Sequence, residues 1–90
     1  MIYARFKDAS KWTTEEQFKK IDEEVGELKE AKTDEEILAE GFDVIQTVFT
    51  LFHVKGFRIE KIDAAAEKHF LKLKKRNNDD EIDISTFYTI

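Results

Sequence analysis

The sequence predicts an all-α protein, an antiparallel helical bundle of three main helices that is completed by oligomerisation. Two S/T-x-x-E capping motifs each precede a run of apolar residues with helical spacing. The chain has no proline and only three glycines, which favours long regular elements. Its 90 residues indicate one domain, 1–90. A chain of this size buries only about 60–65% of its unfolded surface, so burial between subunits would add stability.

The first helix is expected over about 14–32, because Thr13-Thr14-Glu15-Glu16 has the form of a capping box. Its apolar stripe consists of Phe18, Ile21, Val25 and Leu28. The second helix, expected over 34–56, begins after a similar motif at 33–36. It is apolar over more than half of its girth, as in a helix that is central or lies at a subunit interface. Gly56 is the predicted C′ residue that ends it.

The third helix is expected over 58–76, with an inward face made by Ile59, Ile62, Ala66, Phe70 and Leu73. The two ends of the chain are rich in β-branched and aromatic residues. Residues 2–6 and 84–90 therefore form either short strands or non-helical arms that pack on a partner subunit. The remainder of the tail 77–90 is a polar connector.

The composition excludes several classes of protein. There is no cysteine, so neither a disulfide framework nor a thiolate metal site can form. No apolar run approaches the roughly 18 residues of a membrane span, and the first residues do not resemble a signal peptide. We therefore expect a soluble cytoplasmic protein without a membrane. The net charge of −5 argues against nucleic acid as a partner.

Acidic and basic residues are segregated along the chain. Residues 15–43 hold twelve acids and four lysines, a local charge of −8. Residues 58–76 hold seven Lys or Arg and three acids, a local charge of +4. Such a distribution either holds a metal and a polyanion together or places oppositely charged helices side by side.

Four carboxylates form two pairs with helical i,i+3 spacing, Glu24 with Glu27 and Glu40 with Asp43. Glu24 lies at the edge of the apolar stripe of its helix, whereas Glu23 lies nearly opposite that stripe. A short connection would make the two helices neighbours, with the pairs facing each other. Four oxygen ligands suit Mg²⁺ or Mn²⁺. The alternative is a solvated acidic face.

The segment Glu23-Glu24-Val25-Gly26-Glu27, followed after twelve residues by Glu40-Gly41-Phe42-Asp43, resembles a known signature. It is the EExxE…ExxD motif of the MazG-like all-α nucleoside triphosphate pyrophosphohydrolases. The resemblance covers about residues 10–77 and is closest to short single-domain members. Either half of the motif is weak alone, and the two together are more specific. The superfamily also includes dimeric dUTPases and phosphoribosyl-ATP pyrophosphohydrolase.

The resemblance implies a hydrolase that binds Mg²⁺, with Mn²⁺ possible, through Glu24, Glu27, Glu40 and Asp43. It implies catalytic roles for Glu23, Glu24 and Glu27, with Glu23 behind the ligands or orienting water. Nucleoside triphosphates would be cleaved between the α and β phosphates, giving a monophosphate and pyrophosphate. A homodimer or tetramer is implied as well. Which of the five acids touch the metal is left open.

The third helix resembles the family's C-terminal helix, whose spaced basic residues meet the substrate phosphates. The resemblance assigns Lys72 and Arg76 to this role first and Lys68 second. The alternative is a solvated face whose lysine stems cover the core. Upstream of the acids, Trp12 and Gln17 are candidates for nucleobase contacts. Trp12 could equally pack the chain entry onto the bundle.

Two other functions remain open at this point. One is a dUTPase-like or phosphoribosyl-ATP pyrophosphohydrolase on the same fold. The other is a non-catalytic helical interaction module that keeps the acids and binds a protein partner. The sequence does not separate these, nor does it give the preferred base and sugar, dimer versus tetramer, or the biological pathway.

Overall fold

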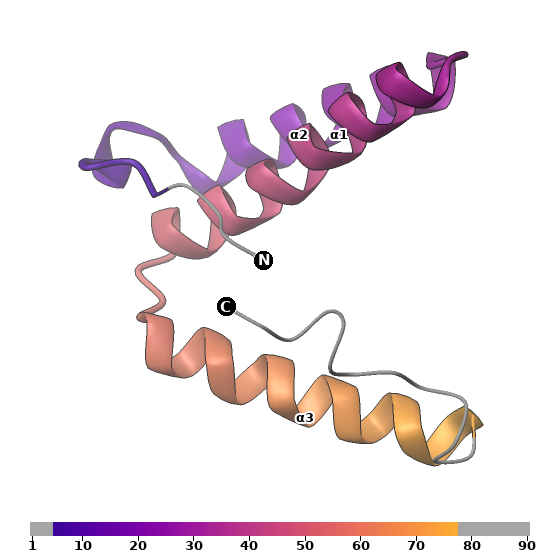
Figure 1. Ribbon diagram of the computed structural model, residues 1–90. Coiled ribbons are helices and arrows are strands. Elements are labelled where there is room, and N and C mark those ends of the chain that lie inside the picture. Colours follow the sequence, from indigo (N-terminus) through magenta and orange to yellow (C-terminus); the bar gives the residue numbers. More distant parts are fainter. Residues whose placement is uncertain (1–4, 78–90) are drawn as a thin grey trace. The chain divides into compact units, whose positions relative to one another are not determined.

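The structure is a computed structural model that describes the backbone of residues 5–77 and the side chains of residues 5–75. Within these residues the protein is all-helical and has no strand, which confirms the predicted class (Figure 1). A single-turn 3-10 helix, η1 (Ala9–Lys11), precedes α1 (Thr14–Glu30), α2 (Asp34–Val54) and α3 (Ile59–Asn77). The predicted strands or arms at 2–6 and 84–90 lie outside the described residues, apart from Arg5 and Phe6, which are in neither helix nor strand.

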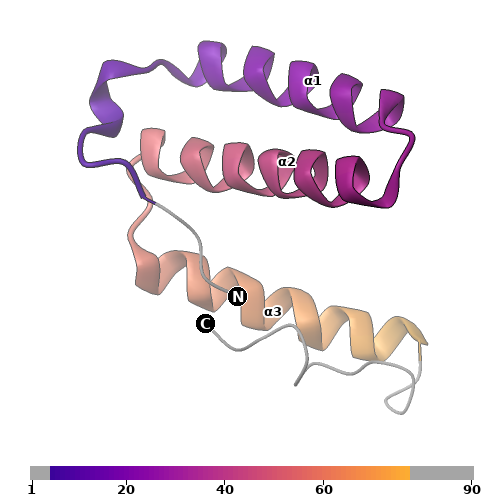
Figure 2. The same cartoon turned by 45° about the horizontal axis from the view of Figure 1, so that its top comes forward.

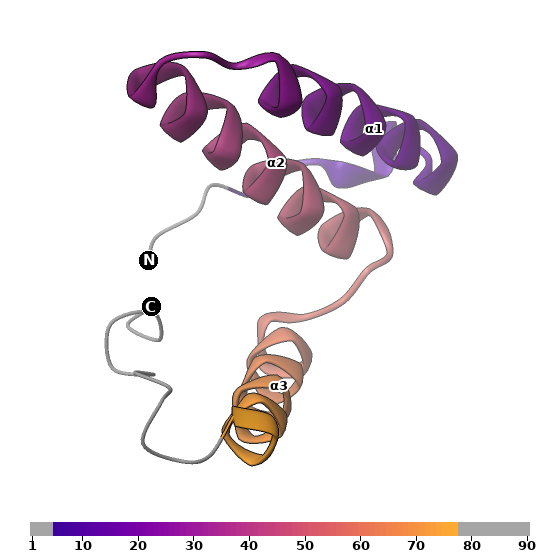
Figure 3. The same ribbon diagram turned by 90° about the vertical axis from the view of Figure 1, so that its right-hand side faces the viewer.

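The chain divides into two compact units. One unit comprises residues 3–56 and contains η1, α1 and α2; the other contains α3. In the first unit α1 and α2 lie side by side, because the connection at residues 31–33 is short and turns the chain back (Figures 2 and 3). The single domain over 1–90 and the bundle of three helices remain predictions.

The expected capping box starts α1. The backbone N–H of Glu16 donates to Thr13 Oγ1 at 3.0 Å, and the backbone N–H of Thr13 donates to Glu16 Oε1 at 3.0 Å. Two N–H groups that have no partner inside the helix are thereby satisfied. Glu15 and Glu16 also place negative charge in the first turn, where the helix dipole favours it. The sequence at 13–16 therefore fixes where this helix begins.

Thr13→Ala is expected to lower the free energy of unfolding by about 1 kcal/mol, because it removes the hydroxyl that accepts the Glu16 N–H. Thr13→Ser keeps that hydroxyl and is expected to lose much less. Urea unfolding followed by circular dichroism measures both variants. An equal loss in the two variants would show that the cap does not act through its hydroxyl.

The second helix is also limited by local chemistry at both ends. Thr33 Oγ1 accepts the Glu36 N–H at 3.1 Å and donates to Glu36 Oε1 at 3.2 Å, so the side chain of Glu36 bonds the hydroxyl here. At the other end, Gly56 has a φ of 80° and donates its N–H to the His53 carbonyl at 2.9 Å. This left-handed conformation is the one that glycine adopts after a helix, as predicted for Gly56. The observed ends of the three helices differ from 14–32, 34–56 and 58–76 by up to two residues.

The face that α1 shares with α2 is more polar than expected. The buried residues of α1 are Gln17 and Glu24, and those of α2 are Thr47 and Thr50. Phe18, at the start of the expected apolar stripe, is 55% exposed. Gln17 and Glu24 each precede a stripe residue by one position, so the buried face of α1 is turned by about 100° from part of that stripe.

The two buried threonines of this interface make hydrogen bonds within α2. Thr47 Oγ1 donates to the Asp43 carbonyl at 2.7 Å, and Thr50 Oγ1 donates to the Gln46 carbonyl at 2.9 Å. Each hydroxyl thus bonds one turn back on its own helix, which removes the cost of burying it. The large apolar side chains of α2 that remain exposed are Ile37, Leu38, Phe42 and Ile45.

The helix α3 is amphipathic. Ile62 is buried, and Ala66, Phe70 and Leu73 of the expected inward face are half-buried, whereas Ile59 is exposed.

By length and composition alone, α2 is long and apolar enough to cross a membrane, a test that core helices of soluble proteins also pass. The expected cytoplasmic location remains a prediction.

Candidate metal centre

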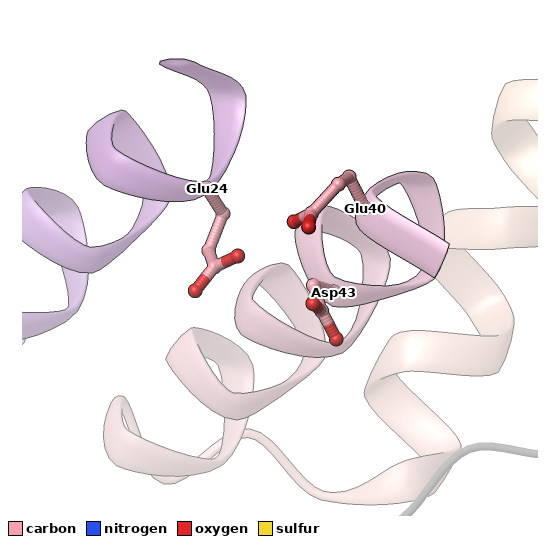
Figure 4. Close-up of side chains that lie close together, drawn as sticks. All are labelled: Glu24, Glu40 and Asp43. Atoms are coloured by element: carbon pink, nitrogen blue, oxygen red, sulfur yellow. The ribbon is translucent and has the colours of Figure 1, made fainter. Parts of the chain in front are cut away.

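Three carboxylates from the two packed helices converge. Glu24 comes from α1, and Glu40 and Asp43 come from adjacent turns of α2 (Figure 4). One oxygen of each lies within 4.8 Å of the others. Glu24 is only 7% exposed, Glu40 is half-buried and Asp43 is exposed. The cluster therefore has a buried end and an end open to solvent.

Two oxygens of the cluster are buried without a hydrogen-bond partner among the described residues. They are Glu24 Oε2 and Glu40 Oε2. A buried carboxylate oxygen that accepts no hydrogen bond costs free energy, and neighbouring carboxylates add repulsion. A hard cation such as Mg²⁺ or Mn²⁺ removes both costs, because it binds carboxylate oxygen and supplies positive charge. The donor set thus fits the cation that the sequence implies.

Glu27, the fourth expected ligand, is exposed and is not one of the three converging carboxylates, but its pKa responds to them. The pKa of Glu27 is raised, first by the negative charge of Glu24 and then by a hydrogen bond with Glu40 and the charge of that residue. A raised carboxyl pKa means that the negative charges around Glu27 increase the free energy needed to ionise it. The structure therefore brings three of the four predicted ligands together, and the role of Glu27 as a ligand remains a prediction.

The metal-free protein is expected to lose stability as the pH rises from the ordinary glutamate range through the raised pKa of Glu27. In that window folded Glu27 binds more protons than unfolded Glu27, so the free energy of unfolding falls with increasing pH. Glu27→Gln is expected to reduce this fall and to raise the melting temperature in EDTA at neutral pH. Melting temperatures of the wild type and of Glu27→Gln, measured in EDTA across the pH range, test both expectations. Unchanged melting curves would mean that Glu27 is not crowded by Glu24 and Glu40.

One cation of the protein already touches the cluster. Lys20 Nζ lies 3.1 Å from Glu24 Oε1 and 3.6 Å from Glu23 Oε2. The hydrogen bond to Glu24, followed by its charge, raises the pKa of Lys20. The Glu23 side chain is 65% exposed, and Glu23 is not one of the three converging carboxylates. Its predicted catalytic role therefore remains a prediction.

A pocket of about 450 Å³ opens beside the carboxylates, within the range of small-molecule sites. Its lining includes both proposed nucleobase residues, Trp12 and Gln17, together with Glu24 and Asp43. The Trp12 ring packs edge-on against Phe6, with 4.8 Å between centroids, and Lys11 Nζ lies 4.4 Å from its centroid. The remaining lining residues are Phe6, Glu16, Lys20, Gln46, Thr47 and Thr50.

The predicted phosphate-binding residues belong to the other compact unit. Lys68 and Lys72 are exposed on α3, where they line a hollow of about 460 Å³ with Leu71 and Lys75. The side chain of Arg76 lies outside the described residues. Their assignment to substrate phosphates remains a prediction.

Comparison with known proteins adds no relative to this description: no family model, curated protein or solved structure matches the chain. Sequence reasoning missed Lys20, Phe6 and the buried threonines as parts of the site. The i,i+4 spacing of Lys20 and Glu24 was the one local signal for the ion pair. Phe6 carries no such signal, because it is brought to Trp12 by the chain before η1.

Proposed function

We propose that the protein is a Mg²⁺-dependent nucleoside triphosphate pyrophosphohydrolase. The observation that carries this proposal is the convergence of Glu24, Glu40 and Asp43 beside a pocket that Glu24 and Asp43 line together with Trp12. The carboxylates suit a divalent cation, and an indole ring offers a stacking surface for a nucleobase. The sequence motif that resembles the MazG-like superfamily contains the same three acids, and it was identified without the structure.

The substrate would lie with its base near Trp12 and Gln17 and its triphosphate at the carboxylates. Glu24, Glu27, Glu40 and Asp43 would hold a divalent cation, which would neutralise phosphate charge and acidify water when bound. A cluster carboxylate accepts the proton of the attacking water, and Glu23 orients that water. The sequence resemblance assigns Lys68, Lys72 and Arg76 to phosphate oxygens. The water attacks the α phosphorus, the bond to the bridging oxygen breaks, and pyrophosphate leaves with the nucleoside monophosphate as the other product.

We propose further that the protein is a cytoplasmic homodimer or tetramer, in which the antiparallel bundle is completed by a second copy. Support comes from the apolar surface that one chain leaves open: Phe18 on α1 and Leu38 and Phe42 on α2 are each more than half exposed. Large apolar side chains exposed on a single chain are typical of subunit interfaces.

The same site could take dUTP or phosphoribosyl-ATP, and the exposed apolar side chains of α2 also suit a non-catalytic module that binds another protein. Thermal unfolding with Mg²⁺ and a non-hydrolysable nucleoside triphosphate separates enzyme from module. Ligand at a hundredfold excess over its dissociation constant adds about 2.7 kcal/mol to apparent stability. A module would show no shift. Identification of the products by ³¹P NMR then distinguishes cleavage at the α–β bond, which gives pyrophosphate, from release of inorganic phosphate.

A further inference from the structure

Lys20 occupies an unusual position for a surface lysine. Its side chain is 53% exposed, yet its ammonium contacts the Glu24 carboxylate, whose side chain is only 9% exposed. Lys20 also lines the pocket, together with Glu24 and Asp43. The positive charge of Lys20 therefore lies next to the carboxylate cluster, on the side of the pocket.

The two oxygens of Glu24 are in different situations. Oε1 binds the ammonium at 3.1 Å, whereas Oε2 is buried and accepts no hydrogen bond from the described residues. A divalent cation that approaches Oε2 would meet the positive charge of Lys20 across the width of a single carboxylate. Ammonium and cation thus compete for the same charge on Glu24.

Glu23 gives the ammonium another place to bind. Its Oε2 lies 3.6 Å from Lys20 Nζ, and its side chain is 65% exposed. A rotation of the long lysine side chain moves the ammonium toward Glu23 without changing the helix, because residues three and four apart lie on one face. Glu24 is then released toward Glu40 and Asp43.

We propose that Lys20 is a resident counter-ion of the carboxylate cluster, which holds Glu24 in the metal-free protein and must move to Glu23 when a divalent cation binds. The inference rests on the cation site of the proposed function and concerns the metal-free state. Lys20 stabilises the fold when the cation is absent, because a buried carboxylate needs a partner. For the same reason it weakens the affinity for a divalent cation.

Binding of Mn²⁺ alone, measured by the electron paramagnetic resonance of the free ion, tests this directly in the full chain without substrate. Lys20→Met is expected to bind Mn²⁺ roughly three- to tenfold more tightly than the wild type, and to melt at a lower temperature in EDTA. Lys19→Met is the matched control: it removes the same charge from the neighbouring exposed residue, for which no ion pair is seen within the described chain. Lys20→Arg keeps the charge and is expected to bind Mn²⁺ no more tightly than the wild type.

Tighter binding by Lys20→Met alone supports the counter-ion, since a merely structural loss would weaken the site. Weaker binding, or an equal gain in Lys19→Met, overturns the inference while the cation site stands. If the folded wild type and both Met variants bind no Mn²⁺, the cation site and the inference fall together.

Discussion

Glu24→Gln is expected to lower Mg²⁺-dependent pyrophosphate release by roughly 10³-fold while leaving the helices folded. Glu24 is the most buried of the three converging carboxylates and carries one of the two unpartnered oxygens. Glutamine has nearly the same shape but no negative charge, so it retains the packing and loses the attraction for a divalent cation. Glu40→Gln, at the other unpartnered oxygen, is expected to have a similar effect.

Kinetics of pyrophosphate release and far-UV circular dichroism, measured on the same preparations, decide this prediction. Glu30→Gln is the matched control, because it makes the identical substitution at an exposed position of α1. We expect Glu30→Gln to keep wild-type activity and all variants to keep wild-type helicity. An active Glu24→Gln enzyme would show that the converging carboxylates are not the catalytic metal site.

Phe42→Glu is expected to dissociate the proposed oligomer, raising its dissociation constant by at least about a hundredfold. Phe42 is 55% exposed in the single chain and shares α2 with Leu38, which is 63% exposed. Apolar side chains of this size stabilise an interface by leaving water, and a buried carboxylate in their place would be unpaired. The neighbouring residue Asp43, a proposed metal ligand, would keep its own side chain.

Analytical ultracentrifugation over a range of concentrations measures this effect. Leu71→Glu serves as control, since Leu71 is 56% exposed but belongs to α3, which is in the other compact unit and is not part of the proposed interface. A wild-type protein that is monomeric at every concentration would refute the proposed oligomer. Equal dissociation by the two variants would place the interface elsewhere.

Local chemistry made the helices predictable. The hydroxyls of Thr13 and Thr33 bond backbone N–H groups three residues later, and Gly56 adopts a positive φ at the end of α2. Each signal acts over a few residues and needs no partner elsewhere in the chain. The pairing of Glu24 with Glu27 and of Glu40 with Asp43 was predictable for a similar reason, because helix geometry fixes which residues share a face.

Contacts between elements were less predictable. Periodicity shows that Phe18 and Gln17 lie on different faces of α1, but it does not show which face meets α2. The structure buries Gln17 and leaves Phe18 exposed, so the face that meets α2 is not the one that the apolar pattern of α1 indicates. The placement of Lys20 on Glu24 is a local i,i+4 contact. Its importance depends on the burial of Glu24, which only the packed helices create.

Pyrophosphate release from a panel of standard and damaged ribonucleoside and deoxyribonucleoside triphosphates, with Mg²⁺ and with EDTA, tests the central claim most directly. The proposal predicts release that requires Mg²⁺ and strongly favours some members of the panel. Folded, oligomeric protein that releases pyrophosphate from none of them would contradict a nucleoside triphosphate pyrophosphohydrolase.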